Sequence, residues 1–362
     1  MLTLTKNNLT AFDLPKSIEW KNGELYLLDQ TLLPHSMVME KQETVEQVWH
    51  SIQVLKVRGA PAIGVAAAYG LCVAVRDAQD LPLDAFIDLV KQKAAYLDSS
   101  RPTAINLNWA MTRMIAHMEK LNVSNARELY ISLVKEAEFI HEEDKKLCLG
   151  MGETGAPLIQ EGMGIMTHCN AGALATSELG TATAPMYVAQ SEGIKFKVFT
   201  NETRPLLQGA RLTSWELQQS GIDVTLLTDN MAAHMMATGH IDMVIVGTDR
   251  VVANGDVANK IGTLGVAIIA KHYGIPFYVA CPSSTIDLNT ADGKDIPIEE
   301  RSADEITIIR GQRIAPENIQ TRSPAFDVTP NELVAGLITE TEIIRAPFEQ
   351  GIKGFFKRKN NK

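Results

Sequence analysis

The sequence has few cysteines and no long uncharged apolar run, and each shortage excludes a class of protein. Its 362 residues include only 4 cysteines, scattered without the spacing of a disulfide framework or a zinc site. We therefore expect reduced thiols and a cytoplasmic protein. No apolar run reaches the ~18 uncharged residues of a membrane-spanning helix, and the N-terminal residues lack the apolar segment of a secretory signal. With 45% hydrophobic and 21% charged residues, the composition is that of a globular protein and excludes wholesale disorder.

Positive charge is also in deficit, which bears on the partners of the protein. There are 34 Lys and Arg residues against 43 Asp and Glu residues, a net charge of −9. Such a surface repels nucleic acid and anionic membranes, so we expect neither as a partner. An anionic small molecule remains a possible ligand if a local cationic pocket exists.

Motifs for cofactors and metals are missing as well. No Gly-Lys-Ser or Gly-Lys-Thr of a phosphate-binding loop occurs, and the eight histidines show no zinc-ligand spacing. The segment 150–155 matches the glycine pattern of a dinucleotide-binding turn, but it follows a predicted helix instead of a strand, so we reject it. The run 141–144 lies on a predicted helix and is interpreted as a solvated face. We expect no metal.

Hydrophobic periodicity divides the chain into two parts near residue 150. Length alone favours two domains at roughly 150 residues each. Alternating residues in 18–28 predict a small antiparallel hairpin, and apolar residues spaced by three and four from Glu43 to Cys148 predict helices. We therefore predict an N-terminal domain, 1–150, of helices plus a short antiparallel sheet.

Short apolar runs alternate with helical patterns after residue 150, which is typical of βαβ units and a parallel, doubly wound sheet. We predict an α/β domain over 151–362. The segment 285–330 is expected to wrap the edge of the sheet, 334–344 to form a last short helix, and 357–362 to be a solvated tail. The predicted strands are 164–167, 196–200, 224–228, 243–246 and 277–280, with helices near 177–192, 205–220, 230–239 and 259–273.

Polar and reactive side chains follow all five predicted strands. In open α/β sheets, ligands bind outside the carboxyl ends of the strands, so we expect a shared crevice there. The alternative is a set of solvated loops, because loops are polar in general. The segments concerned are 168–172, 201–205, 229–230, 247–250 and 281–285.

Two of these side chains are candidates for catalysis. Cys169 is a candidate nucleophile or base, provided that its surroundings lower the pKa of the thiol; the alternative is a buried, inert cysteine. His168 is a poor activating base, because adjacent strand residues point to opposite faces. Asp249 is a candidate general acid, and its alternative role is a helix or turn cap. Cys281 is a weaker site candidate.

Four cationic or polar residues stand near predicted helix starts, where backbone N–H groups favour anions. Asn259 and Lys260 precede one predicted helix, Arg58 a second and Arg101 a third. Each is a candidate for binding a phosphate. Solvated surface charge is the alternative for every one of them.

Five sequence blocks resemble the 5-methylthioribose-1-phosphate isomerases, a family shared with the regulatory subunits of the exchange factor for eukaryotic translation initiation. The resemblance extends from about residue 15 to 345. It implies a dimeric enzyme of methionine salvage that needs no cofactor and has a Rossmann-like C-terminal domain. The blocks are 58–64, 101–107, 167–176, 202–213 and 247–263.

The resemblance also implies roles for individual residues. Cys169 and Asp249 match the catalytic pair of the family. Gln208, which no pattern in the sequence indicates, enters only through this resemblance. One departure is Ser323, which stands where the family pattern has Asn and puts the specificity for the C5 substituent in question. The positions that match the substrate-binding residues of the family are Arg58, Gly59, Ala60, Arg101, Gln208, Asn259 and Lys260.

The implied reaction converts 5-methylthio-α-D-ribose 1-phosphate into 5-methylthio-D-ribulose 1-phosphate. In it, Asp249 would protonate the ring oxygen and Cys169 would take part in the transfer of hydrogen from C2 to C1. Two alternatives stay open. One is an aldose–ketose isomerase of 5-deoxyribose 1-phosphate or another pentose phosphate, and the other is a non-catalytic regulatory protein like the initiation factors.

Overall fold

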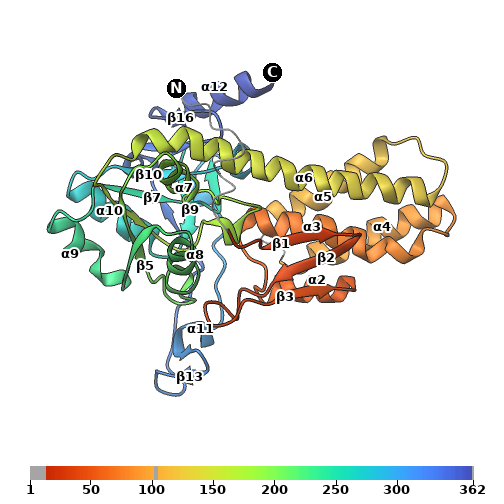
Figure 1. Cartoon of the computed structure of the whole chain (residues 1–362), viewed down its shortest axis with the longest axis horizontal. Helices are drawn as coiled ribbons and strands as arrows, with labels where there is room; N and C mark the ends of the chain where they lie inside the picture. Colours follow the sequence, from red (N-terminus) through yellow and green to blue (C-terminus); the bar gives the residue numbers. More distant parts are fainter. Residues whose placement is uncertain (1–13, 102–104, 361–362) are drawn as a thin grey trace. The chain divides into compact units, whose positions relative to one another are not determined.

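The structure, a computed structural model, describes residues 14–101 and 105–360 and contains two compact units (Figure 1). The N-terminal unit comprises Leu14–Cys148 together with Ala173–Gly180, and the C-terminal unit contains Leu149–Gly172 and the chain from Thr181 onward. The short segment joins the N-terminal unit through buried hydrogen bonds, since Gln30 Nε2 donates to the Leu174 carbonyl at 2.7 Å. A single domain boundary at residue 150 therefore misses the fact that Ala173–Gly180 belongs to the N-terminal unit.

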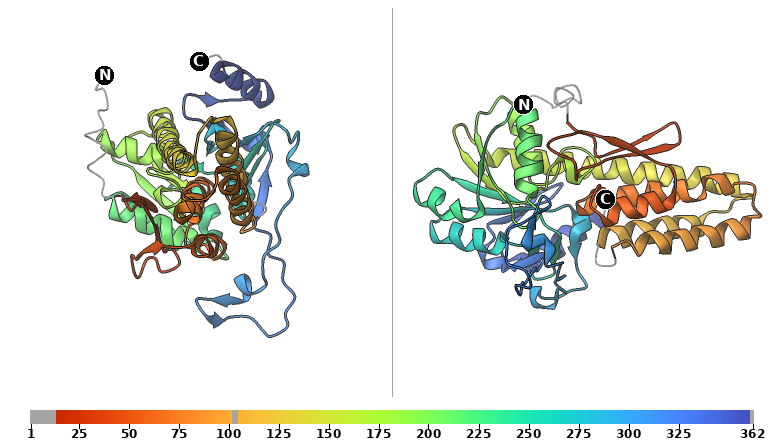
Figure 2. Two further views of the ribbon diagram at one scale, coloured as in Figure 1. Left: turned by 90° about the vertical axis from the view of Figure 1, so that its right-hand side faces the viewer. Right: turned by 90° about the horizontal axis from the view of Figure 1, so that it is seen from below.

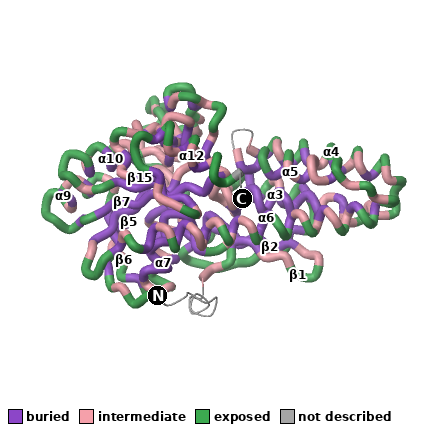
Figure 3. The backbone as a smooth tube through the Cα atoms, turned by 90° about the horizontal axis from the view of Figure 1, so that it is seen from above, coloured by how far each residue is buried: buried purple, intermediate pink, exposed green. Residues whose placement is uncertain are grey.

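The N-terminal unit combines a three-stranded antiparallel sheet with helices, and the hairpin predicted over 18–28 is confirmed. The central helix α3 consists largely of Ala, Val and Gly, so neighbouring helices approach it closely and it is buried nearly all round (Figure 3). By length and composition the segment Ala60–Ala78 could cross a membrane, but 72% of its apolar window is buried, as in a core helix. The elements of this unit are β1 (Ile18–Lys21), β2 (Glu24–Leu28), β3 (Met39–Gln42), α2 (Val45–Gln53), α3 (Ala60–Val75), α4 (Leu83–Asp98), α5 (Ile105–Lys120) and most of α6 (Ala126–Gly155).

The C-terminal unit is built on a seven-stranded sheet in the order β16-β15-β10-β7-β4-β5-β6, in which all neighbours except β16 are parallel. The predicted α/β fold with a parallel sheet is therefore confirmed, and all five predicted strands are present within a residue of their expected bounds. The strands are β4 (Gly164–Thr167), β5 (Lys197–Asn201), β6 (Asp223–Leu227), β7 (Met243–Val246), β10 (Phe277–Ala280), β15 (Gly336–Ile338) and β16 (Ile343–Ile344).

Helices cover both faces of this sheet. Alternate strand residues such as Val244 and Phe277 form one core with α9 (Ala232–Ala237), α10 (Thr263–His272) and α12 (Phe348–Asn360). On the opposite face, the last turns of α6 pack against α7 (Ala184–Ser191), where Gly155 faces Pro185 and Ile338. The sheet is therefore doubly wound, and the loops that follow its parallel strands lie at its carboxyl edge.

Three local expectations are wrong. The segment 334–344 forms strands β15 and β16 instead of a helix, because Gly336–Ile338 pairs with Tyr278–Ala280 of β10. The region 259–273 begins as a strand, β9 (Val257–Lys260), before α10. Residues 357–360 continue helix α12 and so are not a tail, and Lys359 Nζ donates to Glu340 at 2.7 Å, but residues 357–359 are exposed as expected. Residues 361 and 362 lie outside the described residues.

The C-terminal unit also contains a four-stranded sheet with the strand order β11-β8-β9-β14. It contains β8 (Arg250–Val252), β9, β11 (Ile286–Asp287) and β14 (Phe326–Thr329). Between β11 and β14, the hairpin of β12 (Ile308–Ile309) and β13 (Gln312–Arg313) extends away from the sheets of its unit (Figure 2). The expectation that 285–330 wraps the sheet edge therefore fails for this hairpin.

Candidate active site

Strand order places Cys169 and Asp249 at the carboxyl ends of adjacent strands. The chain runs from β4 outward through β5 and β6, then continues with β7 on the other side of β4. Ile165 of β4 is paired with Met243 of β7, so the two strands are in direct parallel contact. Such a reversal of strand order is the position where open α/β sheets bind ligands. Cys169 follows β4 by two residues and Asp249 follows β7 by three, so both predicted catalytic residues leave the sheet at this position.

The chain turns sharply at Cys169. Its φ is +65°, a left-handed conformation that non-glycine residues seldom adopt. The backbone N–H of Cys169 donates to Thr203 Oγ1 at 2.8 Å, and its carbonyl accepts from Thr213 Oγ1 at 2.6 Å. The side chain of Cys169 is buried, with 7% of the residue exposed. Burial therefore does not distinguish Cys169 from the other cysteines, but its left-handed backbone conformation does.

The other three cysteines have ordinary core environments. Cys72, Cys148 and Cys281 are all fully buried, and burial raises the pKa of each thiol. A raised pKa leaves these thiols protonated and unreactive near neutral pH. Cys281 therefore loses its place as a weaker site candidate.

His168 is a buried, neutral histidine with both ring nitrogens engaged. Its Nε2 lies 2.9 Å from the Ile261 carbonyl oxygen, which can only accept, so Nε2 carries the proton. Its Nδ1 then accepts from Asn201 Nδ2 at 3.2 Å. Burial lowers the pKa of His168. Gly262, with φ +103°, leaves room for the ring, because a Cβ there would lie 2.9 Å from Cε1 of His168. The expectation that His168 does not activate Cys169 is consistent with these contacts.

Asp249 lies at the junction of β7 and β8. Its backbone N–H donates to the Ala258 carbonyl of β9 at 3.0 Å, and the preceding Thr248 hydroxyl donates to the same carbonyl at 3.0 Å. A strand, β8, follows directly instead of a helix. The alternative role as a helix cap is therefore wrong, and the half-buried carboxyl side chain stands at the carboxyl edge of the sheet.

Asn259 and Lys260 lie on strand β9, paired with β14. Asn259 is buried, and its Nδ2 donates to Thr263 Oγ1 at 3.0 Å. Lys260 Nζ donates to the Ala325 carbonyl at 3.0 Å and lies 4.7 Å from the centroid of the Phe326 ring. The amide and the ammonium group thus have defined positions on a rigid element.

The start of helix α10 is occupied by a carboxylate of the chain itself. Asp327 accepts from the backbone N–H of Gly262 at 2.7 Å and from that of Leu264 at 3.1 Å. Burial raises the pKa of Asp327 despite these bonds. The expectation that Asn259 and Lys260 grip an anion at this helix start is therefore wrong in its geometry, because Asp327 already fills that position.

Gln208 is buried beside the loop that follows β5. It precedes a π-helical turn, Gly209–Thr213, which leads into α8 (Ser214–Gln219). Its Oε1 atom is buried and has no hydrogen-bond partner among the described residues. An unpaired amide oxygen in this position is a polar group available to a ligand.

The remaining candidates lie at two neighbouring helix starts of the N-terminal unit. Arg58 and Gly59 directly precede α3, Ala60 is its first residue, and Arg101 stands four residues before α5. The first turns of α3 and α5 are in close contact, since a Cβ on Gly64 would lie 2.9 Å from the Asn106 carbonyl oxygen. Two helix starts side by side, each preceded by an arginine, favour an anion.

Gly59 is required at its position. Its φ of +91° is strained for other residues, and an added Cβ would collide with Ala175. No side chain caps α3, so its first N–H groups are not satisfied by a cap residue. The glycine therefore brings the backbone at the start of α3 close to Ala175.

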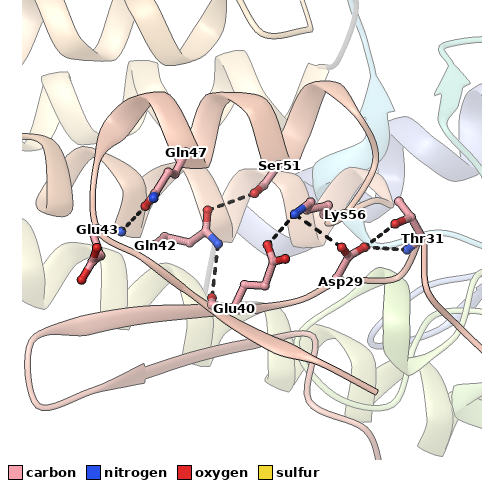
Figure 4. Close-up of polar contacts among 8 residues, drawn as sticks. All are labelled: Asp29, Thr31, Glu40, Gln42, Glu43, Gln47, Ser51 and Lys56. Atoms are coloured by element: carbon pink, nitrogen blue, oxygen red, sulfur yellow. Dashed lines mark hydrogen bonds and ion pairs between the residues drawn. The ribbon is translucent and has the colours of Figure 1, made fainter. Parts of the chain in front are cut away.

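Polar contacts anchor the chain that leads to Arg58 (Figure 4). Lys56 Nζ contacts Glu40 at 2.6 Å and Asp29 at 3.4 Å, which joins the end of α2 to the β2–β3 hairpin. Ser51 Oγ of α2 donates to Gln42 Oε1 at 2.9 Å. These bonds fix the segment two residues before Arg58.

The interpretation of 141–144 as a solvated face is wrong. His141 and Asp144 are buried, because this side of α6 packs inside the N-terminal unit. His141 Nδ1 lies 3.1 Å from the Tyr69 hydroxyl, and burial lowers its pKa to about 4. The rejected glycine pattern 150–155 lies within α6, which confirms that it is not a cofactor turn.

Within the C-terminal unit, Cys169 and Asp249 thus leave adjacent strands at the carboxyl edge of the main sheet, Gln208 lies between β5 and α8, and Asn259 and Lys260 lie on β9 of the four-stranded sheet. The other four predicted residues stand before or at the starts of α3 and α5 in the N-terminal unit.

Thr203 and Asp229, which support the Cys169 loop, lie in the polar segments 201–205 and 229–230 that were predicted to follow strands, but the sequence did not indicate this role. Thr213 lies farther along the chain, directly before α8, and only the resemblance block 202–213 includes it. Among the described residues, no cluster of three or more His, Cys, Asp or Glu side chains is arranged to hold a metal ion.

The sequence profile of the initiation factor 2 subunit family matches residues 56–345. The chain is 55% identical over 340 residues to a 5-deoxyribose 1-phosphate isomerase of Bacillus thuringiensis subsp. konkukian (strain 97-27), covering 94% of this chain and 98% of that protein.

Two solved structures share the fold closely. One is 5-methylthioribose 1-phosphate isomerase from Pyrococcus horikoshii OT3, with 42% identity, a TM-score of 0.92 and 99% of each chain covered. The other is translation initiation factor eIF-2B, subunit delta, from A. fulgidus, with 43% identity, a TM-score of 0.85, and 93% of this chain and 99% of that chain covered.

Proposed function

This chain belongs to the initiation factor 2 subunit family, and within that family we propose that it converts 5-deoxyribose 1-phosphate into 5-deoxyribulose 1-phosphate. Its relatives make it a sugar-phosphate isomerase of the aldose–ketose type. The observation that carries the choice of substrate is the higher identity, over nearly the whole chain, to the Bacillus 5-deoxyribose 1-phosphate isomerase than to the Pyrococcus 5-methylthioribose 1-phosphate isomerase.

5-Methylthioribose 1-phosphate is the second candidate substrate, and it would place the enzyme in methionine salvage. The close structural similarity to the Pyrococcus isomerase favours it. Both substrates carry the same phosphate and the same C1 and C2 groups. They differ only at C5, so the proposed chemistry applies to either.

The chemistry requires an acid and a group that handles hydrogen. Because C1 carries phosphate, the sugar ring cannot open by simple loss of a hydroxyl proton, and the ring oxygen must be protonated. We assign the donation of this proton to Asp249, which follows β7 at the reversal of strand order. Cys169, at the adjacent strand end, is assigned to the transfer of hydrogen from C2 to C1.

The hydrogen can move in two ways. As a proton, it would be taken from C2 by the Cys169 thiolate and returned to C1 through an enol phosphate. As a hydride, it would pass directly between the carbons while Cys169 positions the C2 hydroxyl. Reaction in deuterium oxide separates the two routes, because only the first introduces deuterium at C1.

Arg58 and Arg101 are assigned to the phosphate. Their place before two adjacent helix starts supports this role, since arginine forms paired hydrogen bonds to phosphate and the helix dipoles add positive potential. Gly59 and Ala60 would contribute backbone N–H groups. Lys260 is a further candidate for the phosphate, and Gln208 and Asn259 are assigned to substrate binding through the family resemblance.

A non-catalytic role like that of an initiation factor subunit is the rival function. The similarity to the A. fulgidus protein keeps it under consideration. A regulatory subunit has no need of a thiol and a carboxyl group at adjacent strand ends, and this chain has both. We therefore favour the enzyme. We further propose that it is cytoplasmic and forms a homodimer. Light scattering on the purified protein tests the dimer.

The deciding experiment measures kcat/KM for 5-deoxyribose 1-phosphate and 5-methylthioribose 1-phosphate side by side, with ribose 1-phosphate as a control. A group of this size at C5 changes kcat/KM by about tenfold or more when a pocket discriminates. We expect the 5-deoxy sugar to be preferred. Preference for the 5-methylthio sugar would support the second candidate, and no turnover of any of the three would support the regulatory function.

A further inference from the structure

We propose that Thr203 and Thr213 are positioning residues, whose hydroxyl groups hold Cys169 in the left-handed conformation that its role requires. The inference rests on the proposed function in that Cys169 is taken as a group that acts on the sugar. Neither threonine is assigned to the substrate. They act on the two peptide groups that flank Cys169, one from the loop after β5 and one from the turn before α8.

The conformation of Cys169 needs such support. With φ at +65°, its Cβ is crowded by the neighbouring backbone, so an L-residue adopts this conformation only at a cost in free energy. Glycine would adopt this conformation freely but has no thiol. A residue that must keep its side chain in a left-handed turn therefore depends on hydrogen bonds from its surroundings.

The hydroxyl of Thr213 has a fixed direction. Its Oγ1 accepts from Asn170 Nδ2 at 3.1 Å, so its single proton is available for the Cys169 carbonyl, 2.6 Å away. Asn170 Nδ2 also donates to Glu216 Oε2 at 3.2 Å. Thr213, Asn170 and Glu216, which form this chain of bonds, are all buried, with Glu216 fully so. Burial keeps water from replacing any of these bonds.

The hydroxyl of Thr203 is directed in the same way from the other side. Its Oγ1 accepts the Cys169 N–H at 2.8 Å and donates to the Asn201 carbonyl at 3.1 Å. Thr203 is itself left-handed, with φ +66°, which is a rare state for a β-branched residue. Asp229 holds it there by accepting the backbone N–H of Thr203 at 2.8 Å and that of Arg204 at 2.7 Å.

These bonds link the carboxyl ends of three neighbouring strands. Asp229 follows β6, Thr203 follows β5 and Cys169 follows β4, and the strands are adjacent in that order. The Cys169 loop is therefore supported at both its N–H and its C=O by groups mounted on the rigid sheet unit. Such support keeps a reacting atom within the narrow range of positions that fast chemistry needs.

The test compares Thr203→Val and Thr213→Val, which remove each hydroxyl with little change in shape, with Thr203→Ser and Thr213→Ser, which retain it. We expect each valine variant to lower kcat about five- to tenfold, the size of one lost hydrogen bond. KM should change less than about twofold, because neither hydroxyl touches the sugar. The serine variants should restore kcat. Thr238→Val is the matched control, since its hydroxyl bonds only to backbone carbonyls near the end of α9.

A second readout is independent of the substrate. Iodoacetamide labelling, mapped by mass spectrometry, reports the reactivity of each of the four cysteines. Cys169 is 7% exposed, so release of its loop should raise its labelling rate about fivefold while Cys72, Cys148 and Cys281 stay unlabelled. Unchanged Cys169 labelling, or a rise shared by all four cysteines, would overturn the proposal.

The two hypotheses fail separately. If the wild-type protein turns over no sugar phosphate, the proposed function fails, but the labelling comparison still decides whether the threonines hold Cys169. If turnover is normal and the valine variants match wild type in kcat and in labelling, only the positioning role fails. Thr203→Ala and Thr213→Ala replace any valine variant that does not fold.

Discussion

The two units contain left-handed turns of different design. In front of α3 of the N-terminal unit, the turn uses Gly59, with φ +91°, which has no Cβ to crowd the backbone. After β4 and β5 of the C-terminal unit, the turns use Cys169 and Thr203, and buried side-chain hydrogen bonds hold them. Glycine suffices where only the backbone must approach a neighbour. Where the side chain itself has a task, the surrounding residues must stabilise the turn.

The largest expected effects come from variants in the C-terminal unit. Cys169→Ser and Asp249→Asn should each lower kcat by at least ~10²-fold, the scale of a positioned acid or base. Steady-state kinetics on the preferred sugar phosphate measure it. Cys281→Ser, a cysteine change after β10, is the control and should leave turnover near wild type. Wild-type rates in either test variant would remove that residue from the mechanism.

Burial lowers the pKa of a histidine in each unit, His141 and His168, and His141 of the N-terminal unit gives a testable pH effect. Burial lowers the pKa of His141 to about 4, so the unfolded chain binds its proton first as pH falls below the usual value. Stability is therefore present above about pH 6.5 and declines as pH falls toward the folded pKa. Between pH 7.5 and 5, this one group should reduce the free energy of unfolding by about 2 kcal/mol.

Urea unfolding at several pH values tests this contribution. His141→Gln keeps an acceptor for the Tyr69 hydroxyl and cannot be protonated, so it should flatten the decline with pH. His272→Gln, at an exposed position of α10, should keep the wild-type slope. If both variants decline alike, His141 does not carry the effect.

Arginine variants test the proposed phosphate site of the N-terminal unit. Arg58→Ala and Arg101→Ala should each reduce kcat/KM about tenfold or more, the value of a charge-assisted hydrogen bond to phosphate. The loss should fall mainly on KM, because the phosphate is bound alike in the ground and transition states. Arg127→Ala, whose side chain is 69% exposed, controls for a general loss of positive charge. Unchanged KM would exclude a phosphate role.

The smallest expected effect is on the relative stability of glycine and alanine variants at two left-handed positions, Cys169 and Gly59. At most positions glycine is less stable than alanine, but at Cys169 the left-handed backbone should make Cys169→Gly more stable than Cys169→Ala by about 1 kcal/mol. At Gly59 the opposite change, Gly59→Ala, should destabilise the protein, because its Cβ meets Ala175. Denaturant unfolding measures both. An ordinary glycine penalty at Cys169 would show that its backbone is not left-handed in solution.

Periodicity was sufficient to locate most of the elements around the site. Strands β4, β7 and β10 lie at their predicted bounds, because short β-branched runs flanked by polar loops have few alternatives. The segment 334–344 was mistaken for a helix, since its strands are stabilised by pairing with β10 and not by local preference. Buried His141 and Asp144 were mistaken for a solvated face for a similar reason, as packing decides burial.

The order of residues alone showed which side chains follow the strands. Because parallel strands all end at the same edge of the sheet, those side chains were expected to share that edge. The partners of those side chains could not be inferred. Thr213 reaches the carbonyl of Cys169 across 44 positions, and Asp327 caps the helix start at Gly262 across 65. Hydrogen bonds between residues so distant in sequence depend on strand order and loop path, which no local pattern encodes, and they set the backbone of Cys169 on which the proposed chemistry depends.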